Sequence, residues 1–215
     1  MSTTPADALI VIDMQNDFLP GGNLAVADGD KIIGLIDDVA RQFQNVVLKQ
    51  DWHPADHVSF ASQHVGRKPF DVIHLPYGEQ VLWPDHCVQG THGAQLADGI
   101  DSNLAQLIIR KGYHRSIDSY SAFLEADRKT QTGLAGYLKD RQITNVYLCG
   151  LATDFCVLWS ALDARACGFN VWVIEDATKG IDLNGSLAAA WEQMTKAGVR
   201  RIKSTDSFQL AHAAR

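Results

Sequence analysis

The sequence predicts an α/β protein of the doubly wound class, with a parallel six-stranded sheet between two layers of helices. Short apolar runs bounded by turn residues indicate strands that are buried on both faces. Segments of helical periodicity lie between most of these runs, and strands that alternate with helices favour a parallel sheet. Right-handed crossovers and one reversal of strand order would leave a crevice beside the first strand.

The first half of the chain is predicted to hold two strands, one helix and a long irregular segment. Residues 8–12 form the first expected strand, and a loop with Pro-Gly-Gly-Asn at 20–23 follows. Apolar residues at helical spacing predict a helix over 32–43, directly before a second strand at 46–48. Residues 52–104 are rich in His, Pro, Gly and Trp and show no long periodic segment. An irregular stretch of this length in a compact domain is usually functional.

The second half is predicted to be regular, with four further strands separated by helices. We see no internal repeat, low-complexity tract or linker, so we expect a single domain over 1–215 with the irregular insertion at about 52–104. Thr153 or Asp154 is the expected N-cap of the helix after the fourth strand. In chain order the elements are a strand at 106–110, a helix near 131–141, a strand at 145–149, a helix at 155–167, a strand at 170–175, a helix at 185–197 and a short strand at 199–203.

Charge and cysteine content limit the possible partners. The chain has 215 residues, enough for one sizeable core, and a formal net charge of −6 with both signs mixed along it. No basic stripe is present, so we expect neither a nucleic-acid partner nor a membrane surface. The first apolar run is too short for a signal peptide, and the four cysteines lack Cys-x-x-Cys spacing. These features favour free thiols and a cytoplasmic location, and they leave monomer and homo-oligomer both open.

Reactive side chains follow four of the expected strands. Asp13 follows the first strand and Asp51 the second, while Lys111 ends the third and Cys156 lies just after the fourth. In an open parallel sheet, ligands bind outside the carboxyl ends of the strands. We therefore expect these four side chains to face one crevice.

Cys156 is the strongest candidate nucleophile by position. It lies about one turn into a helix that starts after a strand, where exposed N–H groups and the helix dipole favour a thiolate. The turn at 150–154 can also direct backbone N–H groups at one spot and form an oxyanion hole. A buried structural thiol is the usual fate of a free cysteine, and we assign it to Cys149 and Cys167. Cys87 stays open between the two roles.

Asp13 and Lys111 have a functional and a structural interpretation each. A lone Asp after a strand usually caps a loop, and a strand-end lysine is usually exposed. Beside a cysteine, however, Asp13 can act as general base and then as general acid. Between the two, Lys111 can hold the carboxylate in place and stabilise the thiolate.

The spacing of Asp51 and His53 predicts a metal site. Positions i and i+2 of an extended chain point to the same side, so both side chains face one point. With one more histidine they give two imidazoles and a carboxylate, a set that suits Zn²⁺, Fe²⁺ or Mn²⁺ with open positions. Any single histidine is more often a hydrogen-bonded loop residue. Spacing does not choose the third ligand among His57, His64, His74, His86 and His92.

Five segments carry a resemblance to a known family. Asp-Met-Gln-Asn-Asp-Phe at 13–18, Lys-Gly at 111–112 and Gly-Leu-Ala-Thr-Asp-Phe-Cys-Val at 150–157 resemble the isochorismatase-like cysteine hydrolases. Asp-Trp-His-Pro at 51–54 and Trp-Pro-Asp-His-Cys-Val at 83–88 resemble the nicotinamidases within that family. Each motif alone is weak, but five motifs in the expected order across the chain are very specific.

The resemblance implies the isochorismatase-like hydrolase fold and a catalytic triad of Asp13, Lys111 and Cys156. It also implies a cis peptide bond between Leu151 and Ala152. That bond would direct the N–H of Ala152, together with that of Cys156, at the oxyanion.

For the metal, the resemblance selects His86 as the third ligand beside Asp51 and His53. His57 is the alternative, because some relatives use a histidine shortly after the Asp-x-His pair. Ser59 is a candidate contact for a metal-bound water. One divalent transition metal is the expected cofactor, with Zn²⁺ favoured over Fe²⁺ and Mn²⁺, and no organic cofactor is expected.

Aromatic residues near this end of the sheet are candidate walls of a substrate pocket. Phe18 and Trp83 could hold a flat ring between them, which offset stacking favours. The segment with Tyr120 and Phe123 is similar to a family segment that lines the pocket, and Leu151 is expected nearby. Aromatic side chains are otherwise more often part of the core.

The resemblance implies an amidohydrolase that converts nicotinamide to nicotinate and ammonia through a cysteine thioester. Such enzymes also act on pyrazinamide and serve NAD salvage. The alternative within the fold is a metal-independent relative that cleaves another small amide or a vinyl ether, and the Asp51, His53 and His86 set argues against it. The alternative outside enzymes is a binding protein on the same fold, and the intact triad argues against that.

Overall fold

The computed structural model describes residues 3–207 and confirms the doubly wound fold. Residues 1–2 and 208–215 of the expected domain lie outside this part of the chain. Six parallel strands form a sheet in the order β5-β2-β1-β6-β7-β8, so the order reverses at β1. The strands are β1 (Asp7–Ile12), β2 (Asn45–Asp51), β5 (Leu107–Lys111), β6 (Asn145–Leu151), β7 (Asn170–Lys179) and β8 (Arg200–Ile202).

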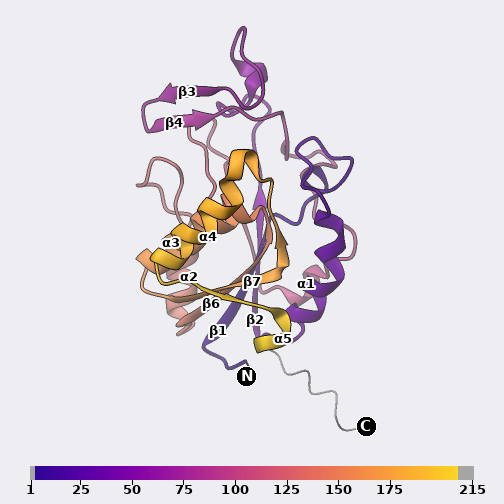
Figure 1. The fold of residues 1–215 in the computed structure, drawn as a ribbon, viewed down its shortest axis with the longest axis vertical. Coiled ribbons are helices and arrows are strands. Elements are labelled where there is room, and N and C mark those ends of the chain that lie inside the picture. Colours follow the sequence, from indigo (N-terminus) through magenta and orange to yellow (C-terminus); the bar gives the residue numbers. More distant parts are fainter. Residues whose placement is uncertain (1–2, 208–215) are drawn as a thin grey trace.

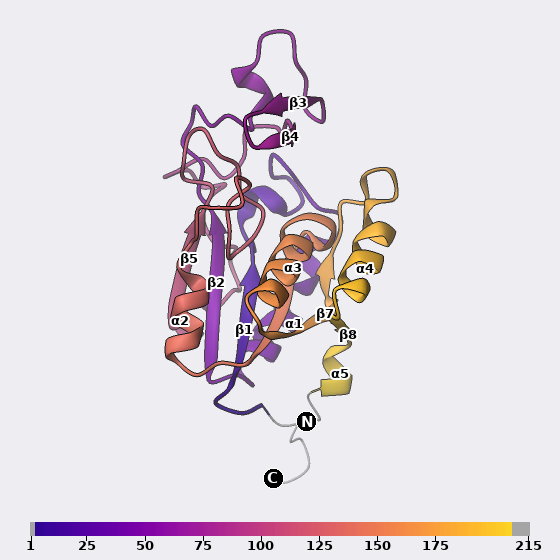
Figure 2. The same ribbon diagram turned by 90° about the vertical axis from the view of Figure 1, so that its left-hand side faces the viewer.

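Helices cover both faces of this sheet (Figures 1 and 2). Residues of α2, α3 and α4 pack with Ile10 and Ile12 of β1 on one face, and residues of α1 pack with Leu9 and Val11 on the other. Successive side chains of a strand point to opposite faces, so an all-apolar run such as β1 fits a strand buried on both. The helices are α1 (Ile33–Ala40), α2 (Leu134–Asp140), α3 (Leu158–Ala166), α4 (Ser186–Lys196) and α5 (Ser204–Ser207).

The irregular insertion contains a hairpin that the sequence analysis did not predict. β3 (Val72–Leu75) and β4 (Gly78–Val81) pair antiparallel, and Figures 1 and 2 show them beyond the carboxyl ends of β2 and β5. Each strand has four residues, which is too short for alternating hydrophobicity to stand out from a loop. The hairpin brings Gln80 to the loop after β5, where its Nε2 donates to Asp118 Oδ2 at 2.6 Å.

Several element boundaries differ from the sequence-based expectation. The helix expected at 155–167 starts as a π-helical turn over Thr153–Val157, and α3 follows it. The helix expected at 32–43 is a 3₁₀ turn over Gly29–Ile32 followed by the shorter α1. β7 runs to Lys179 because its last residues, although polar, still pair with β6. Within residues 3–207, no helix combines the length and apolar character that a membrane crossing requires.

Candidate active site

The carboxyl ends of four neighbouring strands bring the four predicted side chains into one buried cluster. Asp13, Asp51 and Cys156 present carboxylate or sulfur atoms that all lie within 4.8 Å of one another. Lys111 Nζ lies 4.0 Å from Asp13 Oδ2, and all four residues are buried. The structure therefore places these side chains in the one crevice that the strand ends predict.

Asp13 combines an uncommon backbone conformation with a buried carboxylate. Its φ is 48°, a conformation that is uncommon for a residue with a side chain and that clusters at functional sites. Its Oδ2 accepts a hydrogen bond from Lys49 Nζ at 2.5 Å, and its Oδ1 is buried without a partner in the described chain. Burial raises the pKa of Asp13, against the opposing charges of Lys49 and Lys111. A carboxylate with a raised pKa and a free oxygen is suited to proton transfer.

Lys111 has a different main partner from the one that the sequence analysis assigned. Its Nζ donates to Asp51 Oδ1 and, at 2.5 Å, to the carbonyl oxygen of Ser119. Burial opposes its charge, but Asp51, Cys156 and Asp13 raise the pKa of Lys111 well above its usual range. Lys111 is thus a fixed cation between the acids and the thiol, and its hydrogen bond goes to Asp51.

Burial of Cys156 works against the activated thiolate that the sequence analysis expects. Its side chain is buried, and burial raises the pKa of the Cys156 thiol to about 12, although Lys111 and Lys49 lower it. Removal from water therefore outweighs both lysines and the helix start. A thiol of this kind needs a base next to it, and Asp13 lies in the same cluster.

The turn before Cys156 is built differently from a capped α-helix. Ala152, rather than Thr153 or Asp154, is the residue before the π-helical turn, and no side-chain cap is present. The carboxylate of Asp154 instead accepts from the backbone N–H groups of Ile181 and Asp182 at 3.0 and 2.8 Å. This side chain therefore ties the loop after β7 to the turn that carries the thiol.

The peptide bond between Leu151 and Ala152 is cis, as the resemblance implies. The carbonyl oxygen of Ala152 accepts the N–H groups of Phe155 and Val157, both at 3.1 Å. Leu151 itself is part of the core on the α1 face and does not line the cleft, which corrects its assignment to the pocket.

Three side chains form a donor set suited to a metal ion. His53 Nε2 lies 3.3 Å from Asp51 Oδ1, and His86 Nε2 lies 3.8 Å from Asp51 Oδ2. The other ring nitrogens are engaged by backbone carbonyls at 2.8 Å, those of Gly112 for His53 and Pro84 for His86. A ligating histidine usually has its second nitrogen fixed in this way. The donor set and its supporting hydrogen bonds therefore fit a divalent transition metal.

Backbone pairing carries His86 to this point from the irregular insertion. The N–H of His53 donates to the carbonyl oxygen of Cys87 at 3.0 Å, and the N–H of Gln89 donates to the carbonyl oxygen of His53 at 2.8 Å. Gly112 makes room for the ring, because a Cβ there would lie 2.5 Å from His53 Cε1. Its φ of +67° also favours glycine.

His57 stays the alternative ligand, because it forms a second donor group with His53 and Asp118, whose ligand atoms lie within 4.8 Å of one another. Its Nδ1 lies 2.7 Å from Ser59 Oγ and its Nε2 lies 3.2 Å from the carbonyl oxygen of Ile117, so both ring nitrogens are engaged. Burial lowers the pKa of His57 to about 4, and the neighbouring His53 adds to this effect. The hydroxyl of Ser59 is thus engaged in a hydrogen bond with His57. Of the competing histidines, His64, His74 and His92 belong to no metal-type cluster in the described chain.

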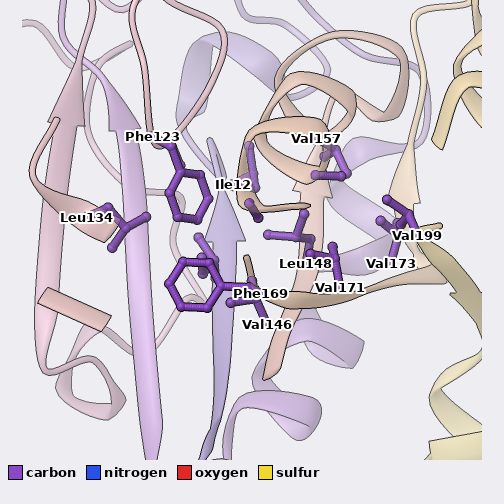
Figure 3. Packing of buried hydrophobic residues seen from close by; sticks show 14 of the residues in the cluster. Ile12, Phe123, Leu134, Val146, Leu148, Val157, Phe169, Val171, Val173 and Val199 are labelled. Atoms are coloured by element: carbon purple, nitrogen blue, oxygen red, sulfur yellow. The ribbon is translucent and has the colours of Figure 1, made fainter. Parts of the chain in front are cut away.

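The cleft above the cluster is lined by aromatic residues, with one correction. Phe18, Trp83 and Tyr120 line it, and Trp83 Nε1 donates to Tyr120 Oη at 3.0 Å. Phe123 does not reach it: its ring packs in the core beside Phe169, with centroids 6.1 Å apart (Figure 3). The sequence analysis missed the lining residues Leu24, Asp118, Ser119, Phe155 and Ile181.

The most informative residue that the sequence analysis missed is Lys49, the main partner of Asp13. In the sequence, Lys49 lies between the second apolar run and Asp51. The available signal was a lysine next to an apolar run of a strand expected to be buried on both faces. A charged residue in that place must find a buried partner.

Comparisons with known proteins agree with this geometry. The isochorismatase domain family matches residues 7–206. A nicotinamidase of Acinetobacter baylyi is 62% identical over 197 residues, which cover 92% of each chain. A solved nicotinamidase/pyrazinamidase of Acinetobacter baumanii superposes with a TM-score of 0.94 and 61% identity, over 95% of this chain and 99% of that chain.

A more distant solved relative carries a metal. A pyrazinamidase of Pyrococcus horikoshii in complex with zinc superposes with a TM-score of 0.73 and 36% identity, over 93% of this chain and 99% of that chain. The family match begins at the first residue of β1 and ends within α5, so it includes the whole sheet and every residue of the cluster. The chain belongs to the isochorismatase family.

Proposed function

We propose that this protein is a nicotinamidase, which hydrolyses nicotinamide to nicotinate and ammonia. The observation that carries the proposal is the placement of the Cys156 thiol, the Asp13 carboxylate and the Asp51, His53 and His86 donor set in one buried cluster. A nucleophile beside a base suits acyl transfer, and the donor set suits recognition of a ring nitrogen. Relatives named as nicotinamidases support the substrate.

The reaction follows from the roles that these side chains can take. Asp13 removes the proton from Cys156 Sγ, which attacks the carboxamide carbon. The backbone N–H groups of Ala152 and Cys156 are the proposed donors to the tetrahedral oxyanion. Asp13 then protonates the departing ammonia, and a thioester remains on Cys156. A water that gives its proton to Asp13 hydrolyses this thioester, releases nicotinate and restores the thiol, while Lys111 balances the negative charge.

Asp51, His53 and His86 are the proposed ligands of one divalent transition metal, with Zn²⁺ favoured. When bound, the ion would orient the pyridine ring through its nitrogen and draw electrons from it. Phe18 and Trp83 flank the cleft and are the proposed ring contacts. His57 and Ser59 are proposed to support the ligand set. The ring of His57 packs against that of His53, with centroids 4.2 Å apart, and its Nδ1 is hydrogen-bonded to Ser59.

The same chemistry extends to pyrazinamide, which has the same carboxamide on a ring with a nitrogen in the equivalent place. We propose one hydrolase domain that acts in the cytoplasm and returns nicotinamide to NAD synthesis as nicotinate. All residues named for the site lie within residues 3–207.

Ammonia release from nicotinamide, with and without a chelator, tests this proposal. We expect steady release by the metal-loaded protein and a large loss after chelation, with recovery when Zn²⁺ is added back. The runner-up function is a metal-independent family relative that cleaves another small amide or a vinyl ether. Undiminished activity after complete metal removal, or no ammonia release from nicotinamide at all, would favour that relative.

A further inference from the structure

A second buried lysine, Lys49, contacts the proposed base more closely than the lysine of the triad does. Its Nζ lies 2.5 Å from Asp13 Oδ2 and 3.1 Å from the carbonyl oxygen of Tyr120. Lys111 Nζ lies 4.0 Å from the same carboxylate oxygen, and its nearest carboxylate partner is Asp51. The direct hydrogen bond to Asp13 therefore comes from Lys49.

The sheet fixes both ends of this contact. Lys49 pairs with Ile12 in the register of β1 and β2, and the N–H of Asp13 donates to the carbonyl oxygen of Lys49 at 2.9 Å. Lys49 is two residues before Asp51, so both side chains leave the same face of β2. The side chains of Lys49 and Asp13 are both fully buried. A lysine in such a place needs a carboxylate partner, because burial of an isolated charge is costly.

This contact makes the two oxygens of the Asp13 carboxylate different. Oδ2 is held by Lys49, whereas Oδ1 is buried and has no hydrogen-bond partner among the described residues. The cluster with Cys156 leaves Oδ1 as the oxygen that is free to exchange a proton. A general base works only when its lone pair is placed at the proton that it removes.

We propose that Lys49 is a positioning residue for the reaction: it holds Oδ2 of Asp13 so that Oδ1 stays free for proton transfer with Cys156 and the leaving ammonia. This inference rests on the proposed function. The site then contains two ion pairs, one between Lys49 and Asp13 and one between Lys111 and Asp51, instead of a triad with a single lysine.

The competing account is that Lys49 only balances buried charge. A purely structural ion pair would affect folding stability and substrate binding along with turnover. A positioning residue affects the chemical step more than binding. The separation of kcat from binding therefore distinguishes the two accounts.

The test compares Lys49→Met, which has a similar length and no charge, with Lys49→Arg, which keeps the charge. We expect Lys49→Met to lower kcat for nicotinamide by about tenfold or more, while the Kd for nicotinate changes by less than about twofold. Lys49→Arg should recover part of kcat, and metal content should be unchanged in both. If Lys49→Met does not fold, Lys49→Gln takes its place with the same expectations.

Gln50→Met is the matched control. Gln50 is the next residue of β2, is also buried, and bonds to the carbonyl oxygen of Ala94 at 3.3 Å on the opposite face. Its kcat should stay within about twofold of wild type. A wild-type kcat in Lys49→Met would overturn the proposal, and so would a loss of kcat that Gln50→Met shares or that follows the Kd for nicotinate.

Alkylation of Cys156 by iodoacetamide separates failure of this inference from failure of the proposed function. The alkylation rate does not depend on any substrate. It should fall by about threefold or more in Lys49→Met, and by less when Asp13→Asn is already present, because Lys49 acts on the thiol through the Asp13 carboxylate. If wild-type protein releases no ammonia from nicotinamide, the proposed function fails and the alkylation comparison alone decides the role of Lys49. An unchanged alkylation rate, or an equal fall with and without Asp13→Asn, would then overturn it.

Discussion

The two halves of this site are built in different ways. Asp13, Lys111 and Cys156 follow strands of the parallel sheet, and the register of those strands fixes where each side chain starts. The proposed metal ligands start from Asp51 at the end of β2, but His53 and His86 come from the irregular insertion, where backbone hydrogen bonds join their two loops. The proposed chemistry therefore lies on a rigid scaffold. The proposed ring recognition lies on an insertion, where substitutions are tolerated more easily.

Several hydrogen bonds join the two halves. Lys111 donates to Asp51, and the side chain of Gln15 bonds to both the N–H and the carbonyl oxygen of Asp51, at 2.7 and 2.8 Å. Trp83 of the insertion donates to the hydroxyl of Tyr120. If the division is right, substitutions in one half should change catalysis or metal binding separately.

Removal of the thiol should give the largest effect and leave the other half intact. Cys156→Ala should lower ammonia release by about 10⁴-fold or more, because no other nucleophile is placed in the cluster. Metal content should match wild type by elemental analysis. Cys149→Ala is the control, since Cys149 is also buried but lies in the core on the α1 face, and it should keep most activity. Release by Cys156→Ala at the wild-type rate would end the cysteine mechanism.

The state of the thiol can be tested by its pH dependence. The pKa of Cys156 is raised to about 12 in the folded protein, whereas a free thiol has a pKa of about 8.5. Between these values the folded protein holds a thiol where the unfolded chain holds a thiolate. At about pH 9, inside this window, alkylation of folded Cys156 should therefore be slower than that of free cysteine by about tenfold or more, as followed by peptide mass spectrometry. A rate equal to or above that of free cysteine would contradict this prediction and support an activated thiolate.

Loss of a metal ligand should affect the insertion half. His86→Ala should lose most of its metal and lower kcat/KM by about tenfold to a hundredfold, because His86 Nε2 faces the Asp51 carboxylate. His57→Ala is matched in residue type and burial, but both ring nitrogens of His57 are engaged by protein groups. It should keep more metal than His86→Ala. The reverse order would make His57 the third ligand.

The rigid half was the part of the site that the sequence could predict. Strand ends follow from apolar runs, so the meeting of Asp13, Asp51, Lys111 and Cys156 could be predicted from positions alone. The partner of each charge could not, because distances of 2.5 and 4.0 Å decide between Lys49 and Lys111. The burial that raises the pKa of Cys156 is likewise a property of the packed site.

The insertion half shows where sequence reasoning ends. Residue spacing left five histidines open, and only the resemblance to a family selected His86. The rings of His53 and His86 meet because their loops pair through backbone groups, which no side-chain pattern reveals. Phe123 was misplaced for a related reason: it lies close in sequence to the cleft residue Tyr120, but its ring points into the core. In a loop without periodicity, nearness in sequence does not fix direction.

We propose that the side chains at the strand ends cleave the amide and that the metal-ligand set recognises the ring nitrogen. Benzamide tests it most directly, because it has the same amide and nearly the same shape but no ring nitrogen. The account predicts a kcat/KM for nicotinamide that exceeds that for benzamide by about a hundredfold or more in metal-loaded protein, and a much smaller ratio after metal removal. Benzamide cleaved as well as nicotinamide by the metal-loaded protein would contradict it.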